Sequence, residues 1–357
     1  MDEKQNKGRE LRLVAFEVTR SCNLSCVHCR ASSEYGPYPD ELSTQEAITL
    51  LQDIRKVGQP IVILTGGEPL LRQDIFHIAQ YGTQLGLKMV MATNGTLLNE
   101  EMARGIIDSG IKRVSISLDG ADQDSHDGFR RVQGAFEASL RGIQVLRQAG
   151  IEFQINTTIV KSNRDQLHRI NQLAVSLGAK AHHIFLLVPV GRGGDVGDMS
   201  LEAQEYENIL EWFLERKGKV PLELKATCAP QYYRILRQRA KEGGQEVTFK
   251  THGMDAVTRG CLGGLSFCFV GHRGQVQPCG YLEVECGNIR ERPFTEIWKE
   301  SPIFLRLRDF SNYKGKCGKC EYLKVCGGCR ARAYELHGDF MMEEPLCSYI
   351  PRSMRGK

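Results

Sequence analysis

The chain has 357 residues, of which 41% are hydrophobic and 25% are charged. This composition is ordinary for a globular protein and excludes disorder of the whole chain. Lysine and arginine together exceed aspartate and glutamate by only four, so we expect neither a nucleic acid nor an anionic membrane as a partner.

The beginning of the chain and its apolar runs bear on localisation. Residues 1–10 are polar and charged and lack the apolar centre of a signal peptide. The sequence has no apolar run of 18 residues, so we expect no membrane-spanning segment. We therefore expect a cytoplasmic protein.

The first half of the chain alternates apolar strands with amphipathic helices. The expected strands are residues 11–18, 61–64, 89–92, 114–118, 153–160 and 183–188. The expected helices are residues 43–56, 73–85, 99–109, 134–149 and 165–177. Ser43 and Glu46 have the spacing of a capping box at the start of the first helix. This alternation predicts a parallel sheet, and six units are too few for a closed eight-stranded barrel, so we expect an α/β fold with an open, partial (β/α)6 barrel.

The pattern changes after residue 190. Residues 191–194 read Gly-Arg-Gly-Gly and interrupt the periodicity, and residues 202–216 and 230–242 then read as helices. Short segments punctuated by glycine and cysteine follow from about residue 251. We therefore expect the partial barrel at residues 11–190, a helical linker at residues 191–250, and a metal-organised domain at residues 251–350.

Cysteine is the unusual feature of the composition, with 13 residues. A secreted disulfide scaffold would be short and would pair its cysteines, whereas clustered thiols in a cytoplasmic protein usually bind metal or take part in catalysis. Three cysteines lie near the start, Cys228 stands alone, and nine lie after residue 260. The sequence therefore indicates two cysteine-rich regions with separate roles.

The first group, Cys22, Cys26 and Cys29, has C-x3-C-x2-C spacing directly after the first expected strand. Catalytic groups of parallel α/β barrels gather at the carboxyl ends of the strands. Three thiolates can hold three irons of a 4Fe–4S cluster and leave the fourth iron open to a ligand. The alternative is zinc, which usually takes four ligands; His28 is a candidate, but its neighbour Cys29 makes simultaneous binding awkward.

A second motif makes residues 11–190 resemble the radical S-adenosylmethionine (SAM) enzymes. Residues 65–69, Thr-Gly-Gly-Glu-Pro, follow the second strand and match the GGEP motif of that family. The family usually has an aromatic residue before the third cysteine, where this chain has His28. The resemblance implies a catalytic 4Fe–4S cluster on the three cysteines. The residues that it implies for SAM binding are Gly66, Gly67, Glu68, Thr93, Ser117, Arg130, Asn156, Leu187 and Val188.

The resemblance also implies the reaction type. In this family a reduced cluster passes one electron to SAM, and the resulting 5′-deoxyadenosyl radical abstracts hydrogen from an unactivated carbon. The cofactor carries this step, while the protein aims the radical and excludes water. A low-potential electron donor, flavodoxin or ferredoxin, is therefore an expected partner.

The second cysteine region resembles the SPASM extension of these enzymes, which carries two auxiliary 4Fe–4S clusters. When the ligand positions of SPASM relatives are carried over to this chain, the first auxiliary cluster is held by Cys261, Cys268, Cys279 and Cys329. Cys286 is an alternative to Cys268 in this set. The second is held by Cys317, Cys320, Cys326 and Cys347. Two residues separate Cys326 from Cys329, where relatives commonly have three, so the partition stays open. A pair of zinc knuckles is the alternative, although zinc ribbons usually space their cysteine pairs more widely.

The substrate is suggested by a finer resemblance. Residues 19–24, 183–189, 225–230 and 326–334 resemble the haem synthases of the sirohaem-derived pathway. That resemblance implies conversion of iron-coproporphyrin III to haem b, in which two propionates lose CO2 and become vinyls and an auxiliary cluster accepts electrons. The alternatives are the removal of acetate side chains from didecarboxysirohaem, maturation of a peptide, and a non-catalytic electron carrier, which would need no SAM pocket.

A tetrapyrrole with four carboxylates requires cationic partners. Arg30, Arg192 and Lys225 are the candidates, and His182 and His183 are candidates to approach the porphyrin or its iron. We expect the protein to act as a monomer.

Overall fold

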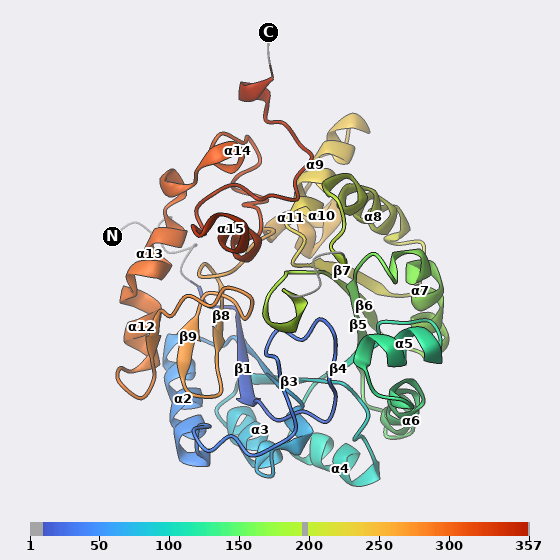
Figure 1. Cartoon of the computed structure of the whole chain (residues 1–357). Coiled ribbons are helices and arrows are strands. Elements are labelled where there is room, and N and C mark those ends of the chain that lie inside the picture. Colours follow the sequence, from blue (N-terminus) through green and yellow to red (C-terminus); the bar gives the residue numbers. More distant parts are fainter. Residues whose placement is uncertain (1–9, 195–198, 356–357) are drawn as a thin grey trace.

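The computed structural model describes residues 10–194 and 199–355. The strands form one curved sheet, and helices surround the outer side of this sheet (Figure 1). The polar start of the chain, in which we expect no signal peptide, lies almost entirely outside the described residues. In the part of the chain that the structure describes, each helix is too short or too polar to cross a lipid bilayer.

The six expected strands are present and parallel. They are β1 (Leu13–Thr19), β2 (Ile61–Gly66), β3 (Lys88–Thr93), β4 (Val114–Ser117), β5 (Phe153–Ile159) and β6 (Ala181–Leu186). The five expected helices are α2 (Thr44–Val57), α3 (Ile75–Gln84), α4 (Glu100–Asp108), α6 (Ala135–Gln148) and α7 (Leu167–Ser176). The capping box of Ser43 and Glu46 begins α2 as predicted. One further helix, α5 (Gln123–Arg130), was not expected.

The sheet is wider than the sequence predicts. Two additional parallel strands extend it, β7 (Glu223–Thr227) beside β6 and β8 (Phe267–Val270) beside β1. In the described part of the chain, the strand order is β10-β9-β8-β1-β2-β3-β4-β5-β6-β7. Strand β7 lies between α8 (Ala203–Arg216) and α9 (Gln231–Glu242), so the segment expected to be a helical linker also supplies a strand. It was missed because it is short and carries two charged residues, Glu223 and Lys225.

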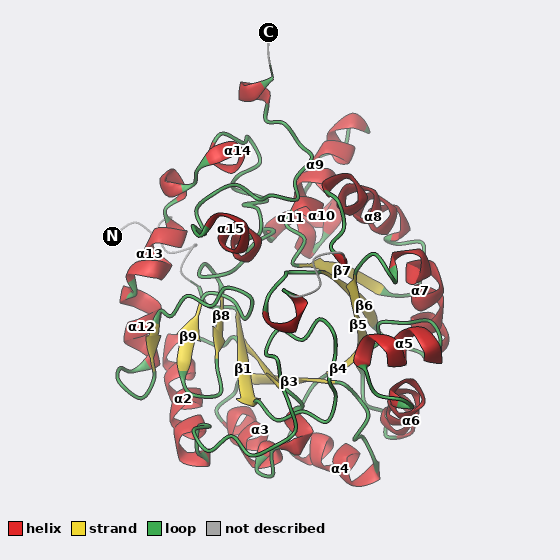
Figure 2. Ribbon diagram, viewed as in Figure 1, coloured by secondary structure: helices red, strands yellow, loops and turns green. Residues whose placement is uncertain are grey.

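The cysteine-rich half consists of short elements, as expected, with long connecting loops (Figure 2). Strands β9 (Gln275–Gln277) and β10 (Gly287–Asn288) are antiparallel. The helices are α10 (Phe249–His252), α11 (Met254–Val257), α12 (Phe294–Glu300), α13 (Pro302–Arg308), α14 (Gly315–Gly318) and α15 (Arg330–His337). The 3-10 turns among the described residues are η1 (Pro69–Leu71), η2 (Arg164–Gln166), η3 (Gly191–Gly193), η5 (Phe310–Asn312) and η6 (Arg352–Met354).

Two apolar clusters account for most of the buried core. The larger one fills the space between the parallel sheet and its outer helices, and extends to α12 and to Phe304 in α13. The smaller one includes Val188 and Val190 after β6, together with Cys329 and Ala331 of the C-terminal region. The end of the barrel chain therefore packs directly into the cysteine-rich region.

A buried polar group also joins the two halves. Glu17 of β1 is 1% exposed and accepts hydrogen bonds from Arg30 Nη2 at 2.7 Å and from His272 Nδ1 at 2.8 Å. Burial alone would raise the pKa of Glu17, but Arg30 and His272 lower it to about 2. The carboxylate therefore links the loop that carries Cys29 to the turn between β8 and β9.

Candidate functional site

The three N-terminal cysteines lie in the loop that follows β1. This loop lies over the open centre of the curved sheet in Figure 1. Cys22 and Cys26 are buried and Cys29 is partly exposed, and all three pack in one small apolar cluster with Leu24 and Ala135. The structure therefore brings the predicted catalytic cysteines together at the carboxyl end of the first strand.

The surroundings of these thiols suit metal-bound sulfur. Backbone amides donate to the sulfurs of Cys22 and Cys29 at 3.4 Å in each case, and Arg130 Nη1 donates to Cys26 Sγ at 3.5 Å. Burial raises the pKa of Cys22 to about 12 and also raises the pKa of Cys26. A bound metal deprotonates such thiols, and the donated hydrogen bonds then stabilise the thiolates.

The cysteine loop is held from both sides. The His28 ring stacks on Phe129 at 4.4 Å between centroids, so it occupies an aromatic packing position. Arg192 of η3 donates to the carbonyl oxygens of Cys26 at 3.0 Å and Ser33 at 2.9 Å. Arg192 therefore supports the loop, and this engagement weakens its candidacy as a substrate ligand.

The Gly-Gly-Glu motif packs against the same loop. A Cβ atom on Gly66 would lie 2.3 Å from the carbonyl oxygen of Thr19, and one on Gly67 would lie 2.3 Å from that of Ser21. Backbone atoms cannot yield easily, so both positions require glycine. This close approach sets the cysteine loop directly against the end of β2.

Glu68 is fully buried, and its carboxylate is already well partnered. It accepts hydrogen bonds from Thr93 Oγ1 at 2.7 Å, from the Asn94 amide at 2.8 Å and from the Leu70 amide at 3.1 Å. Burial raises the pKa of this carboxyl. Glu68 thus ties the ends of β2 and β3 together, and its role in binding SAM stays a prediction.

Arg130 lies between the cluster loop and the end of β4. It is buried, donates to Cys26, and forms an ion pair with the buried carboxylate of Asp119. The Thr158 amide donates to the other Asp119 oxygen at 2.6 Å. The Nε atom of Arg130 is buried and makes no hydrogen bond. A buried guanidinium with a free donor can bind a carboxylate, which fits the SAM-binding role that the resemblance implies for Arg130.

Four polar residues form one row across the inner face of the sheet. Strand register pairs Ser117 with Asn156, Asn156 with His183, and His183 with Lys225. Paired residues point to the same face, and their apolar neighbours along each strand belong to the main core. The Lys225 side chain is exposed in this row, although the surrounding protein lowers its pKa. The sequence predicted each of these residues as a separate candidate. It could not predict that they form a row, because their alignment depends on the register of four strands.

The remaining predicted site residues are buried or already make contacts within the protein. Leu187 and Val188 are buried, and the Leu187 carbonyl oxygen accepts hydrogen bonds from Tyr206 at 2.9 Å and Arg332 at 3.4 Å. His182 is fully buried and bonds within the core. Apart from its contact with Glu17, Arg30 stacks on Phe269 at 4.5 Å. Lys225 is therefore the best placed of the three candidate cations.

The second group of thiols lies around one cavity. The cysteines that line it are Cys317, Cys320, Cys326 and Cys347. Backbone amides donate to the sulfurs of Cys317 at 3.3 Å and Cys326 at 3.5 Å, and Arg330 Nη2 donates to Cys317 at 3.6 Å. Four thiols with donated hydrogen bonds fit a 4Fe–4S cluster with four cysteine ligands.

The third group is only partly as predicted. Cys261 and Cys329 are close to Cys279, and together with burial they raise the pKa of the Cys279 thiol to about 12. Cys268 instead lies on β8 in the main core with Cys286. In residues 10–194 and 199–355, no three His, Cys, Asp or Glu side chains converge on the position of a single metal ion. The ligands of a 4Fe–4S cluster bind different irons, so they need no such convergence.

One buried ion pair connects these groups. Arg332 and Glu344 are each 1% exposed at the side chain and pair at 2.9 and 3.1 Å. Glu344 also accepts from the Cys329 amide at 2.6 Å, and its own amide donates to Cys317. Since Arg332 donates to the Leu187 carbonyl oxygen, the pair joins both C-terminal thiol groups to the end of the barrel.

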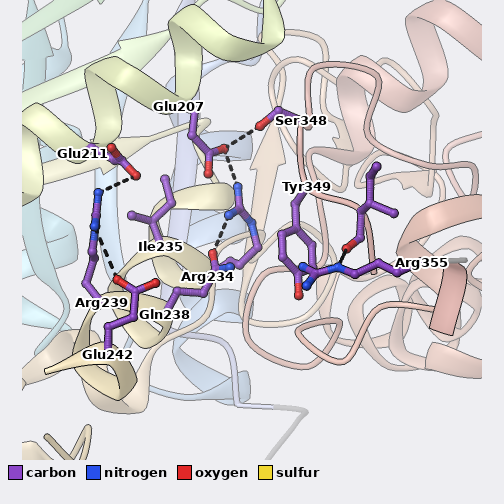
Figure 3. Close-up of a pocket in the computed structure, with 11 residues that line it drawn as sticks. Glu207, Glu211, Arg234, Ile235, Gln238, Arg239, Glu242, Ser348, Tyr349 and Arg355 are labelled. Atoms are coloured by element: carbon purple, nitrogen blue, oxygen red, sulfur yellow. Dashed lines mark hydrogen bonds and ion pairs between the residues drawn. The ribbon is translucent and has the colours of Figure 1, made fainter. Parts of the chain in front are cut away.

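A larger cavity lies between α8, α9 and the C-terminal segment (Figure 3). Its charged side chains pair with one another, Arg234 with Glu207 and Arg239 with Glu211 and Glu242. None of the predicted site residues lines it. Arg234 lines both this cavity and the cavity of the second thiol group.

Comparisons with known proteins agree with this site. Residues 16–174 match the model of the radical SAM superfamily, and residues 261–330 match SPASM, an iron–sulfur cluster-binding domain. The AdoMet-dependent heme synthase of Nitratidesulfovibrio vulgaris is 57% identical over 96% of this chain and 94% of its own. That of Methanosarcina barkeri is 53% identical over 95% and 97%. The Fe-coproporphyrin III synthase of M. barkeri is 32% identical over 94% and 87%.

Solved structures give the same fold at low sequence identity. Streptococcus suis SuiB bound to S-adenosylmethionine has a TM-score of 0.74 at 16% identity, covering 97% of this chain and 80% of that protein. AdoMet-bound anSMEcpe has a TM-score of 0.64 at 19% identity, covering 90% and 89%. The expected fold, a partial barrel followed by a cysteine-rich domain, is confirmed.

The buried ion pair gives a prediction about stability. Glu344→Ala leaves Arg332 buried without its partner, which typically costs about 3 to 5 kcal/mol. We expect this loss in the free energy of unfolding, measured by anoxic urea denaturation with circular dichroism. The matched control is Glu335→Ala, which removes an exposed carboxylate from α15. A loss below about 1 kcal/mol would contradict the role given to the pair.

Proposed function

The chain belongs to the radical SAM superfamily, with a SPASM domain, and we propose that it synthesises haem b from iron-coproporphyrin III by oxidative decarboxylation of two propionates. The observation that carries this proposal is the identity of 53 to 57% to AdoMet-dependent heme synthases over nearly the whole chain. The chain is a radical SAM enzyme, and the polar row with Lys225 on the inner face supports a substrate that carries carboxylates.

The competing reactions have weaker support. Didecarboxysirohaem deacetylation, which forms iron-coproporphyrin III, is favoured only by the relative named Fe-coproporphyrin III synthase, at 32% identity. Peptide maturation is favoured by the mycofactocin maturase of Mycolicibacterium smegmatis, at 29% identity. Both of these relatives are less similar in sequence to this chain than the haem synthases are.

The cofactors follow from the thiol groups. The proposed content is three 4Fe–4S clusters, with the catalytic one on Cys22, Cys26 and Cys29 and two auxiliary ones in the C-terminal region. SAM would lie between the cluster loop, the Gly-Gly-Glu edge and Arg130. When bound, the reduced cluster and SAM supply a radical that removes a hydrogen atom from a propionate, and an auxiliary cluster supplies the acceptor for the electron released with CO2.

The chain's own residues bind and position these groups. The free Nε–H of Arg130 can donate to the carboxylate of SAM, while Asp119 keeps the guanidinium in place. Ser117 and Asn156, at the β4 end of the inner row, offer hydrogen-bonding groups for the nucleoside. Lys225, at the far end of the same row, can pair with a propionate. The row therefore spans the distance from the SAM side to the substrate side.

The proposal extends to partners and location. Flavodoxin or ferredoxin would supply the low-potential electron. The protein would work in the cytoplasm, where both the donor and reduced thiols are maintained, and it would act as a monomer.

An anoxic turnover assay tests the reaction. The reconstituted enzyme, SAM and a chemical reductant are incubated with iron-coproporphyrin III or didecarboxysirohaem, and products are read by mass spectrometry. We expect loss of two CO2 and formation of haem b from the first substrate, with no acetate loss from the second. Acetate loss from didecarboxysirohaem alone, or SAM cleavage without either product, would overturn the proposal.

A substitution tests the role of Lys225. Lys225→Gln removes the cation from the inner row, so the KM for iron-coproporphyrin III should rise about tenfold, as expected for loss of one charge-assisted hydrogen bond to a carboxylate. The iron content and the 5′-deoxyadenosine formed without substrate should stay unchanged. Lys219→Gln, in an exposed turn, is the control. An unchanged KM would show that Lys225 does not contact the substrate.

A further inference from the structure

The geometry points to Cys228 as the fourth ligand of the first auxiliary cluster, in the place that cysteine spacing assigns to Cys268. This inference rests on the proposed cluster content and concerns only which side chains hold it. Cys261, Cys279 and Cys329 remain the other three ligands.

Cys268 faces the wrong side of its strand. It is fully buried in the main apolar core, where it has Cys286 as its neighbouring thiol. The next residue, Phe269, points to the opposite face, because side chains alternate along a strand. Phe269 lies under Arg30 and near Gly280, which is next to Cys279. The sheet backbone therefore stands between Cys268 and the thiol group that it was expected to join.

Cys228 lies on the correct side. It directly follows β7, so it stands at the carboxyl edge of the parallel sheet. With Cys279 it packs against the smaller apolar cluster, which contains Cys329. The thiols of Cys279, Cys329 and Cys261 all lie within electrostatic range of the Cys228 thiol. All three expected partners are therefore near this one thiol.

The backbone around Cys228 supports the same arrangement. Gly260 packs against Pro230 so closely that a Cβ atom would lie 2.5 Å from the Cα of Pro230. The Cys261 amide donates to the Cys326 carbonyl oxygen at 3.1 Å, which fixes the chain that carries Cys261. The segments before Cys261 and after Cys228 are thus in direct contact.

Cys228 also has an unusual backbone conformation. Its φ angle is +54°, in the left-handed region, and only two other described residues besides glycines have a positive φ, Ser32 and Arg131. Such a conformation is unfavourable for a residue with a Cβ atom and persists at sites where a function requires it. Glycine would adopt it freely, so the presence of cysteine indicates that the thiol itself is needed.

The local charge fits four thiolates around a cluster. Arg332 is buried and lies within electrostatic range of both Cys228 and Cys329. Its pairing with Glu344 holds the guanidinium in position. A fixed cation next to two of the ligands stabilises the negative charge of a buried cluster that is held by four thiolates.

The decisive comparison is between Cys228→Gly and Cys268→Ala. Glycine accepts the positive φ, so Cys228→Gly removes the thiol without straining the backbone. After anoxic reconstitution, the wild-type chain should hold about 12 iron and 12 sulfide, and Cys228→Gly should lose up to about four of each. It should also lose the signal of one cluster from the EPR spectrum of the reduced protein. Cys268→Ala should keep the wild-type iron content and spectrum.

The outcomes separate the two proposals. A wild-type chain with only about four irons would overturn the proposed cluster content. Full iron and an unchanged spectrum in Cys228→Gly, or a lost cluster in Cys268→Ala, would overturn the ligand assignment alone. If Cys228→Gly loses the circular dichroism of the wild type, Cys228→Ser decides. Its hydroxyl can replace the thiolate, so an altered spectrum with retained iron supports the assignment and an unchanged spectrum overturns it.

Discussion

The buried ion pair of Arg332 and Glu344 is the interaction on which the arrangement of the C-terminal half depends. It contacts the Cys329 amide, the Cys317 sulfur through the Glu344 backbone, and the carbonyl oxygen of Leu187 at the end of the barrel. Removing two charges from water is costly, and such a pair is tolerated only where further hydrogen bonds satisfy its atoms. Here the Glu344 carboxylate accepts from the Cys329 amide, Arg332 donates to the Leu187 carbonyl oxygen, and the Glu344 amide donates to the Cys317 sulfur. One pair therefore sets the position of both cysteine groups relative to the barrel.

The barrel imposes a second constraint, because its parallel strands all end on the same side. The cysteine loop after β1, the Gly-Gly-Glu edge after β2, and Asp119 after β4 therefore meet at one place. Strands β7 and β8 extend this edge in both directions, one toward Cys228 and the other toward the turn that carries His272. The cysteine-rich region is thus built onto the two edges of the barrel sheet. Glu17 adds a direct polar link between the barrel and this region, because it bonds to both Arg30 and His272.

The sequence predicted the features that depend on local pattern. The six strands, seven helices and the capping box at Ser43 follow from periodicity and spacing, as do the two cysteine motifs. Strand β7 was missed because charged side chains at Glu223 and Lys225 interrupt its apolar character, although in the structure they point to the inner face. The inner row and the environment of Cys228 depend on strand register and on which face a residue occupies, and one sequence carries no direct signal for either. Spacing alone could not distinguish Cys228 from Cys268 for the same reason.

The central claim is that a radical formed at the N-terminal cysteine loop acts on the propionates of a tetrapyrrole held in the barrel. Iron-coproporphyrin III deuterated at the propionate carbons attached to the ring tests this most directly. The account predicts that deuterium appears in 5′-deoxyadenosine as vinyl groups form, because the hydrogen is taken from those carbons. Vinyl products accompanied by 5′-deoxyadenosine free of deuterium would contradict it.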